Sequence, residues 1–148
     1  MRNRRDRAVF RDEAKIRILL TKLKANHIKF VYPHLCPARP DGAIAAADPV
    51  QTERFLSVAG ELGIIVIPWV GGVYGESARP TDPLWRQKFV ASVAALIAAH
   101  PEIGGIQINI EPLPDGDRDF LLLLDELRPV LAGRILGVAA YPPPTRWH

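Results

Sequence analysis

Four short apolar runs alternate with four amphipathic segments along this chain, and that order constrains its fold more than any other feature. Apolar residues at helical spacing predict helices at residues 11–26, 48–63, 82–100 and 117–129. Runs rich in β-branched residues predict strands at residues 28–35, 64–70, 106–111 and 135–141. Short apolar strands that alternate with helices form parallel sheets covered by those helices. The chain is therefore expected to be an α/β protein.

Aspartate residues mark where three of the predicted helices begin. Asp48 and Asp82 each precede a proline, and the aspartate side chain caps the helix while proline, which has no N–H, fits its first turn. Asp117 or Asp119 is expected to cap the last helix. Pro129 should kink or end that helix, because it cannot donate a backbone hydrogen bond and crowds the preceding turn.

Polar and apolar residues alternate along the third predicted strand. Its isoleucines fall on one face, and Gln107, Asn109 and Glu111 fall on the other. An open flavodoxin-like sheet has the same order of elements, but its inner strands are apolar on both faces. A row of polar residues on one face fits the lumen of a barrel better. We therefore expect a partial (β/α)8 TIM barrel, with about four parallel strands alternating with helices.

The length of the chain is about half of what a closed barrel needs. Its 148 residues hold four predicted strands, whereas about 250 residues are typical for eight. Residues 1–10 are expected to be a basic N-terminal tail, and residues 11–148 an incomplete β/α barrel segment. The segment is expected to be part of a longer chain, or a half-barrel that a second copy completes as a homodimer, since alone it exposes two strand edges.

The positive charge of the chain lies at its start. The formal net charge is +3, and the four arginines and one aspartate within residues 1–7 account for all of it. A basic tail can bind nucleic acid or an anionic surface, or it can simply be a solvated terminus. Because no aromatic residue stands among these arginines to stack on bases, a nucleic-acid partner is not expected.

Metal binding and membrane insertion find little support in the composition. Cys36 is the only cysteine, expected to be packed in the interior, and the four histidines lack metal-ligand spacing, so neither a metal nor a cofactor is expected. No run approaches the roughly 18 apolar residues of a membrane span. No signal peptide is recognisable at the start, so the chain as written is expected in the cytoplasm.

Glu111 is the candidate catalytic group. It is the last residue of the polar row, at the carboxyl end of its strand, where β/α barrels carry their active sites. Asn109 lies roughly 6–7 Å deeper along the strand. Partial burial beside neutral amides should raise the pKa of the carboxyl group, which suits a general acid such as the proton donor of a glycosidase. The alternative is a solvated strand face without function.

Aromatic residues gather at or after the predicted strand ends. They stack on sugar rings in carbohydrate sites, or they fill the mouth of a barrel by packing. Trp69 and Tyr141 are the first candidates for contact with a sugar, and Tyr32 and Gln107 are further candidates for substrate binding. The remaining aromatic positions at this rim are His34, Tyr74 and Trp147.

The segment from residue 64 to residue 112 resembles glycoside hydrolase family 18, the chitinase-like barrels. That family carries S-x-G-G at the end of its third strand, and Trp69-Val70-Gly71-Gly72 matches it except for Trp69. This glycine pair is also expected to end the second strand of the chain. The family motif D-x-x-D-x-D-x-E aligns with Gly104 to Glu111, so only the glutamate is kept. On this alignment the four strands are the second to the fifth of the family barrel.

The resemblance implies a mechanism assisted by the substrate. In the family, the 2-acetamido oxygen of the sugar attacks the anomeric carbon, and the motif glutamate protonates the leaving group. Glu111 would then be the acid, and Asn109 would hold the acetamide without supplying a charge. The Asn-x-Glu pair is also similar to that of family 85 endo-β-N-acetylglucosaminidases. Gln107 stands where family 18 has a buried carboxylate.

Three functions therefore stay open for the chain. The first is a glycoside hydrolase-like barrel segment that acts on oligosaccharides or polysaccharides containing N-acetylhexosamine, with Glu111 as general acid. The second is a carbohydrate-binding barrel without catalysis, which would fit the loss of the aspartate row. The third is a truncated fragment that is inactive by itself, because four strands cannot enclose the acid.

Overall fold

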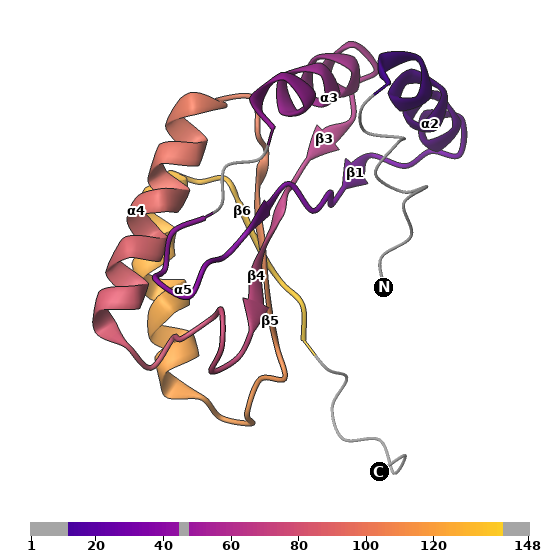
Figure 1. Cartoon of the computed structure of the whole chain (residues 1–148). Coiled ribbons are helices and arrows are strands. Elements are labelled where there is room, and N and C mark those ends of the chain that lie inside the picture. Colours follow the sequence, from indigo (N-terminus) through magenta and orange to yellow (C-terminus); the bar gives the residue numbers. More distant parts are fainter. Residues whose placement is uncertain (1–11, 45–47, 141–148) are drawn as a thin grey trace, which may run out of the picture.

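The computed structural model describes residues 12–44 and 48–140, which form four helices and six short strands (Figure 1). The helices are α2 (Glu13–Ala25), α3 (Pro49–Glu61), α4 (Pro83–Ala99) and α5 (Arg118–Leu131). The strands are β1 (Phe30–Val31), β2 (Cys36–Pro37), β3 (Ile65–Val66), β4 (Trp69–Val73), β5 (Gly105–Glu111) and β6 (Ile135–Val138). Tyr141, Trp147 and the basic tail of residues 1–10 lie outside the described residues.

All strand pairs between these elements are parallel, and the strand order follows the sequence. β1 pairs with β3, and the larger sheet has the order β2-β4-β5-β6. An open doubly wound sheet reverses direction at a switch point, whereas a barrel adds each strand beside the previous one. The sequential order is that of a barrel, so the predicted class, a partial α/β barrel, is confirmed.

The first two predicted strands are interrupted at prolines. Within the run at 28–35 only β1 forms, and β2 follows just after the run, with Pro33 between the two strands. The run at 64–70 contains β3 and the start of β4, with Pro68 between them. Proline cannot donate a ladder hydrogen bond, so pairing stops on either side of it. The chain nevertheless continues in the same direction, because Trp69 N donates to the carbonyl of Pro33 at 3.1 Å.

The expectation that Gly71-Gly72 ends the second strand was wrong. β4 runs through both glycines to Val73, and Gly71 pairs with Asn109 of β5. Gly71 has a φ of +150°, and a Cβ atom there would overlap the carbonyl oxygen of Asn109. The glycine therefore lets two backbones approach more closely than any side chain would permit, rather than stopping the strand.

The helix starts follow the predicted capping chemistry. Asp48 accepts a hydrogen bond from Gln51 N at 3.2 Å, and Asp82 accepts one from Leu84 N at 2.9 Å. Of the two alternatives for the last helix, Asp117 is the cap, and it accepts from Phe120 N at 2.9 Å. The helix that contains Pro129 ends two residues later, at Leu131.

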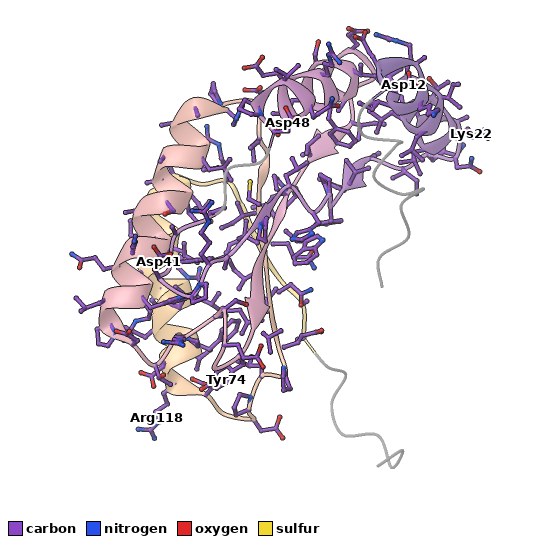
Figure 2. All side chains as sticks on the ribbon, in the orientation of Figure 1. Asp12, Lys22, Asp41, Asp48, Tyr74 and Arg118 are labelled. Atoms are coloured by element: carbon purple, nitrogen blue, oxygen red, sulfur yellow. The ribbon has the colours of Figure 1, made fainter. Side chains whose placement is uncertain are left out.

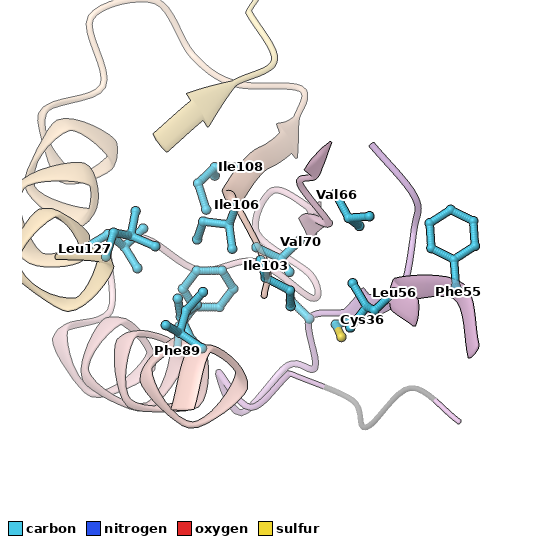
Figure 3. Close-up of a cluster of buried hydrophobic side chains, with 14 of the residues drawn as sticks. Cys36, Phe55, Leu56, Val66, Val70, Phe89, Ile103, Ile106, Ile108 and Leu127 are labelled. Carbon is cyan, nitrogen blue, oxygen red and sulfur yellow. The ribbon is translucent and has the colours of Figure 1, made fainter. Parts of the chain in front are cut away.

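The apolar core lies between the strands and the helices (Figure 3). The three isoleucines of β5 are at most 1% exposed and contribute to the same core as Phe89 of α4 and Leu127 of α5. Full burial of such a side chain is worth about 1.5–3 kcal/mol. Cys36 is buried in this core as expected. Burial of the isoleucines leaves the polar row of β5 on the opposite face of the sheet.

Arg86, a buried arginine, ties α4 to α5, which lie side by side along one face of the strands (Figure 1). Its Nε lies 3.3 Å from both carboxylate oxygens of Glu126, and its Nη1 donates to the carbonyl of Pro80 at 2.6 Å. These partners compensate for the cost of removing the guanidinium from water. In the part of the chain that the structure describes, no helix has the length and apolar character needed to cross a bilayer.

The close approach of β4 to β5 predicts opposite effects for two glycine-to-alanine changes. Gly71→Ala should lower the free energy of unfolding by about 2–4 kcal/mol, because the new methyl group collides with the backbone of Asn109. Gly60→Ala, inside α3 with open space around it, should raise it by about 0.5–1 kcal/mol. Urea denaturation of both variants and the parent chain measures the two signs. Equal effects of the two changes would contradict the close approach.

Candidate active site

The polar row occupies the face of β5 away from the helices, as its spacing predicts. Gln107 and Asn109 are half-buried and Glu111 is exposed, whereas the isoleucines between them are buried. Each polar residue stands opposite a residue of β4, namely Trp69 beside Gln107, Gly71 beside Asn109 and Val73 beside Glu111. The aromatic side chain therefore lies deepest, and the carboxylate lies at the carboxyl end of the strand.

A cleft of about 440 Å³ opens on this face of the sheet. It brings together Trp69, Asn109 and Glu111, three of the residues singled out from the sequence. Its other described lining residues come from the segment around β2, from β4 and from the turn after β4, namely His34, Pro37, Ala38, Gly71, Gly72, Val73 and Ser77. The cleft therefore combines an aromatic part with one amide and one carboxylate.

Asn109 presents a buried oxygen that has no partner. Its Oδ1 is shielded from solvent and accepts no hydrogen bond from the described residues. Gly71, across the strand pair, has no side chain that could supply a donor. A buried acceptor without a partner costs about 1–3 kcal/mol, so such atoms are rare unless a ligand or a water completes them. Asn109 also lines the cleft, so this unpartnered acceptor lies next to the space that a ligand would enter.

Glu111 is held through its backbone while its side chain is left open. Its carbonyl oxygen accepts a hydrogen bond from Tyr74 N at 3.0 Å, which extends the β4–β5 ladder past the last register pair. The residue is exposed, which differs from the partly desolvated position expected from the sequence. Among the described residues, no ion pair engages its carboxylate. A ligand that covers the cleft would have to supply the missing desolvation.

His34 and Trp69 form a stacked pair in the cleft. Their ring centroids lie 3.8 Å apart, and their planes are inclined by 9°. Offset stacking of flat rings stabilises such pairs by about 0.5–1.5 kcal/mol. One face of Trp69 is therefore occupied by the imidazole ring, a contact that the sequence could not reveal, because 34 residues separate the two rings along the chain.

The other predicted substrate-binding residues lie apart from the cleft. Gln107 stands beside Trp69 one step deeper than Asn109, and it is not among the described lining residues. Tyr32 is 48% exposed and belongs to the segment between β1 and β2, also outside the lining. Tyr141 lies outside the described residues. Of the three expected substrate contacts that lie within the described residues, Trp69 alone lines the cleft.

Two residues that sequence reasoning did not connect meet beside Glu111. The hydroxyl of Tyr74 donates to Asp117 Oδ2 at 2.6 Å, across 43 residues of sequence. This bond to a carboxylate, together with burial, raises the pKa of Tyr74 to about 12. Tyr74 lies at the end of the molecule where β4 finishes (Figure 2). Its proximity to a strand end was visible in the sequence, but its partner was not.

The turn after β4 is shaped by a serine that the sequence analysis overlooked. Ser77 Oγ accepts a hydrogen bond from Val73 N at 3.0 Å, and Ser77 also lines the cleft. A Cβ atom at Gly72 would collide with this hydroxyl, so the second glycine gives the turn its room. Within residues 12–44 and 48–140, no three His, Cys, Asp or Glu side chains come close enough together to hold a metal ion.

Comparison with known proteins identifies related folds. No protein-family description matches the sequence, and no curated protein matches it. Three solved structures superpose well on the chain. One is the C-terminal domain of a protein named as a chitinase from Desulfitobacterium hafniense DCB-2, with a TM-score of 0.71 and 18% identity. The chain covers 42% of that structure, which in turn covers 86% of the chain.

Two further similar structures are a chitinase and a spore cortex-lytic enzyme. A chitinase from Chromobacterium violaceum ATCC 12472 has a TM-score of 0.63 and 21% identity over 80% of this chain and 40% of its own. The spore cortex-lytic enzyme SleL of Bacillus cereus has a TM-score of 0.64 and 14% identity over 82% of this chain and 30% of its own. The chain thus spans less than half the length of each. At these identities the likeness shows the fold alone, a partial α/β barrel.

The unpartnered oxygen of Asn109 predicts an unusual response to substitution. Asn109→Leu should leave the free energy of unfolding unchanged or raise it by up to about 1 kcal/mol, because it replaces an unsatisfied acceptor with an apolar group of similar size. Asn26→Leu is the matched control, because Asn26 Nδ2 donates to Lys22 O at 2.8 Å, and its loss should cost about 1 kcal/mol. Urea denaturation measures both. A loss above about 2 kcal/mol for Asn109→Leu would show that the amide is needed for folding.

Proposed function

We propose that this chain forms the acid-bearing part of a glycoside hydrolase-like barrel that acts on glycans containing N-acetylhexosamine. The observation that carries the proposal is the unpartnered Oδ1 of Asn109, which shares one cleft with the carboxylate of Glu111. An acetamide group offers the N–H that this oxygen lacks. The carboxyl ends of parallel strands, where Glu111 stands, are the usual place for catalysis in β/α barrels.

The proposed reaction is substrate-assisted hydrolysis. The acetamido oxygen of the sugar attacks the anomeric carbon, the bond to the leaving oxygen breaks, and Glu111 gives its proton to that oxygen. Water then opens the cyclic intermediate, and Glu111 takes a proton back. Asn109 accepts the acetamide N–H and so directs the acetamido oxygen toward the anomeric carbon. As a neutral amide it orients the group without adding a negative charge to balance the cationic intermediate.

The pattern of β4 supports assignment to the chitinase-like families within this fold. Gly71 and Gly72 occupy the two glycine positions of the family 18 motif, and in this structure both are places where a Cβ atom would collide. Glu111 occupies the position of the family acid at the end of the next strand. The Asn-x-Glu pair is closer to the motif of family 85. We therefore propose a relative of family 18 or family 85, and the substrate that the protein cleaves would distinguish the two families.

Binding without cleavage is the second candidate, and the exposure of Glu111 favours it. A general acid is most effective where water is excluded, and the described part of the chain leaves this carboxylate open to solvent. The stacked His34–Trp69 pair would still offer an aromatic surface to a sugar. Hydrolysis would then require the rest of a barrel to close over the cleft, and the 148 residues alone would bind glycans without turnover.

The acid assignment predicts a loss of turnover with binding preserved. Glu111→Gln keeps the size of the side chain but cannot donate the proton, so hydrolysis of chitooligosaccharides should fall at least about a hundredfold while their affinity stays within about threefold. Turnover by reducing-end release and affinity by calorimetry measure the two effects. Asp115→Asn, a carboxylate change in the loop after β5, is the control. Equal turnover by the parent chain and Glu111→Gln would end the acid assignment, and binding without turnover by the parent would favour the second candidate.

The proposed role of Asn109 predicts a loss of binding affinity that depends on the acetyl group of the sugar. Asn109→Leu should weaken binding of N-acetylglucosamine oligomers about tenfold, because a hydrogen bond in the cleft is lost, which is worth about 1.4 kcal/mol. Oligomers of unacetylated glucosamine should bind the variant and the parent alike. Calorimetric titration of both sugars against both proteins provides the comparison. An equal loss for the two sugars would mean that Asn109 does not recognise the acetamide.

A further inference from the structure

The loop that follows Glu111 is fastened at both ends by one residue of the neighbouring strand. Tyr74 lies directly after β4, and its backbone N–H donates to the carbonyl of Glu111 at 3.0 Å. Its hydroxyl donates to Asp117 Oδ2 at 2.6 Å. Both ends of the segment from residue 111 to residue 117 are therefore hydrogen-bonded to Tyr74, the first end to its backbone and the second to its side chain.

Asp117 carries two hydrogen bonds at once. Its Oδ1 accepts from Phe120 N at 2.9 Å and so caps α5, while its Oδ2 accepts from the Tyr74 hydroxyl. A carboxylate bound through both oxygens has little freedom to rotate. The end of the loop is thereby attached both to the first turn of α5 and to the turn after β4.

The loop itself has few ways to hold its shape. Two of its residues, Pro112 and Pro114, have no N–H to donate, and Gly116 adopts a positive φ of 69°. Leu113 packs against the core, but no hydrogen bond within the described residues ties residues 112–116 to β4. The two Tyr74 contacts thus supply the hydrogen-bonded support of the loop.

We propose that Tyr74 is a positioning residue for Glu111, acting as a clamp that holds the segment from residue 111 to residue 117. The inference rests on the proposed function, because it assigns Tyr74 a task for that acid. A glutamate side chain has three rotatable bonds, and catalysis requires its carboxyl group to be held within about 0.5 Å of its working position. Holding the backbone at Glu111 and at Asp117 fixes the point and the direction from which the Glu111 side chain leaves the chain.

Loss of the clamp should affect one end of the loop, whereas loss of a packing residue would destabilise the core. Tyr74→Phe keeps the ring and the backbone N–H but removes the hydroxyl, so the core and the β4–β5 ladder are preserved. Only the Asp117 end of the loop is released. The raised pKa of the Tyr74 hydroxyl, about 12, agrees with a proton held tightly between the two oxygens.

The experiment combines a dynamic and a kinetic readout on the full chain. Amide hydrogen exchange measured by NMR should rise at least tenfold at Phe120 and Leu121, whose N–H groups are hydrogen-bonded to Asp117, in Tyr74→Phe and stay unchanged in α2, α3 and α4. In a chain that keeps Tyr74, Asp117→Asn retains one oxygen for the α5 cap and places an NH2 group, which donates, beside the Tyr74 hydroxyl oxygen, so it should retain most of the protection. Tyr32→Phe, at an exposed tyrosine, is the control and should change neither region.

With chitooligosaccharides as substrate, Tyr74→Phe should lower kcat about tenfold and leave KM unchanged, because the clamp orients the acid without touching the sugar. Unchanged exchange at Phe120 and Leu121 overturns the clamp whatever the kinetics show. Raised exchange with unchanged kcat overturns the positioning role. If the parent chain turns over no glycan, the proposed function fails separately, and the 13C shift and line width of the Glu111 carboxyl decide the positioning. Broadening in Tyr74→Phe supports it, and an unaltered signal overturns it.

Discussion

The close contact between the backbones of β4 and β5 is the constraint on which the site depends. These strands pair over five successive positions, and at Gly71 the approach leaves no room for a side chain. The register that results sets Trp69 beside Gln107 and Val73 beside Glu111. Because a shift by one residue would turn the polar row into the core, this one ladder decides which face carries the chemistry.

The helix layer gives that ladder its two different faces. α4 and α5 cover the isoleucine side of β5 and are tied together by the buried Arg86, so apolar residues there are removed from water. The other face has no helix over it in the described part of the chain, and its side chains border a cleft instead of a core. A parallel sheet covered on one side, with strands in sequential order, is the geometry of a barrel wall. The superposition with chitinases and a spore cortex-lytic enzyme agrees with this geometry.

The polar row of β5 departs from the family 18 motif that it resembles in a specific way. Where the family 18 motif has carboxylates, this strand carries Gln107 and Asn109, both neutral. An amide can orient a ligand through a hydrogen bond, but it cannot balance a positive charge. In the proposed function, Asn109 therefore recognises the ligand through its buried oxygen, and Glu111 is the proposed proton donor. Trp69, in place of the motif serine, adds a ring that already packs on His34.

The sequence by itself determined the four helices, the parallel direction of the strands and the side of β5 that is polar. Hydrophobic periodicity and the capping residues Asp48 and Asp82 are local signals, because a helix start or a strand face depends on residues only a few positions apart. Tertiary structure alone decided that Gly71 continues its strand, that His34 stacks on Trp69 and that Tyr74 reaches Asp117. It also decided that Asn109 Oδ1 accepts no hydrogen bond from the described residues and that Glu111 is exposed. These facts depend on residues distant in sequence, whose distances are fixed only when the strands pair and the helices pack.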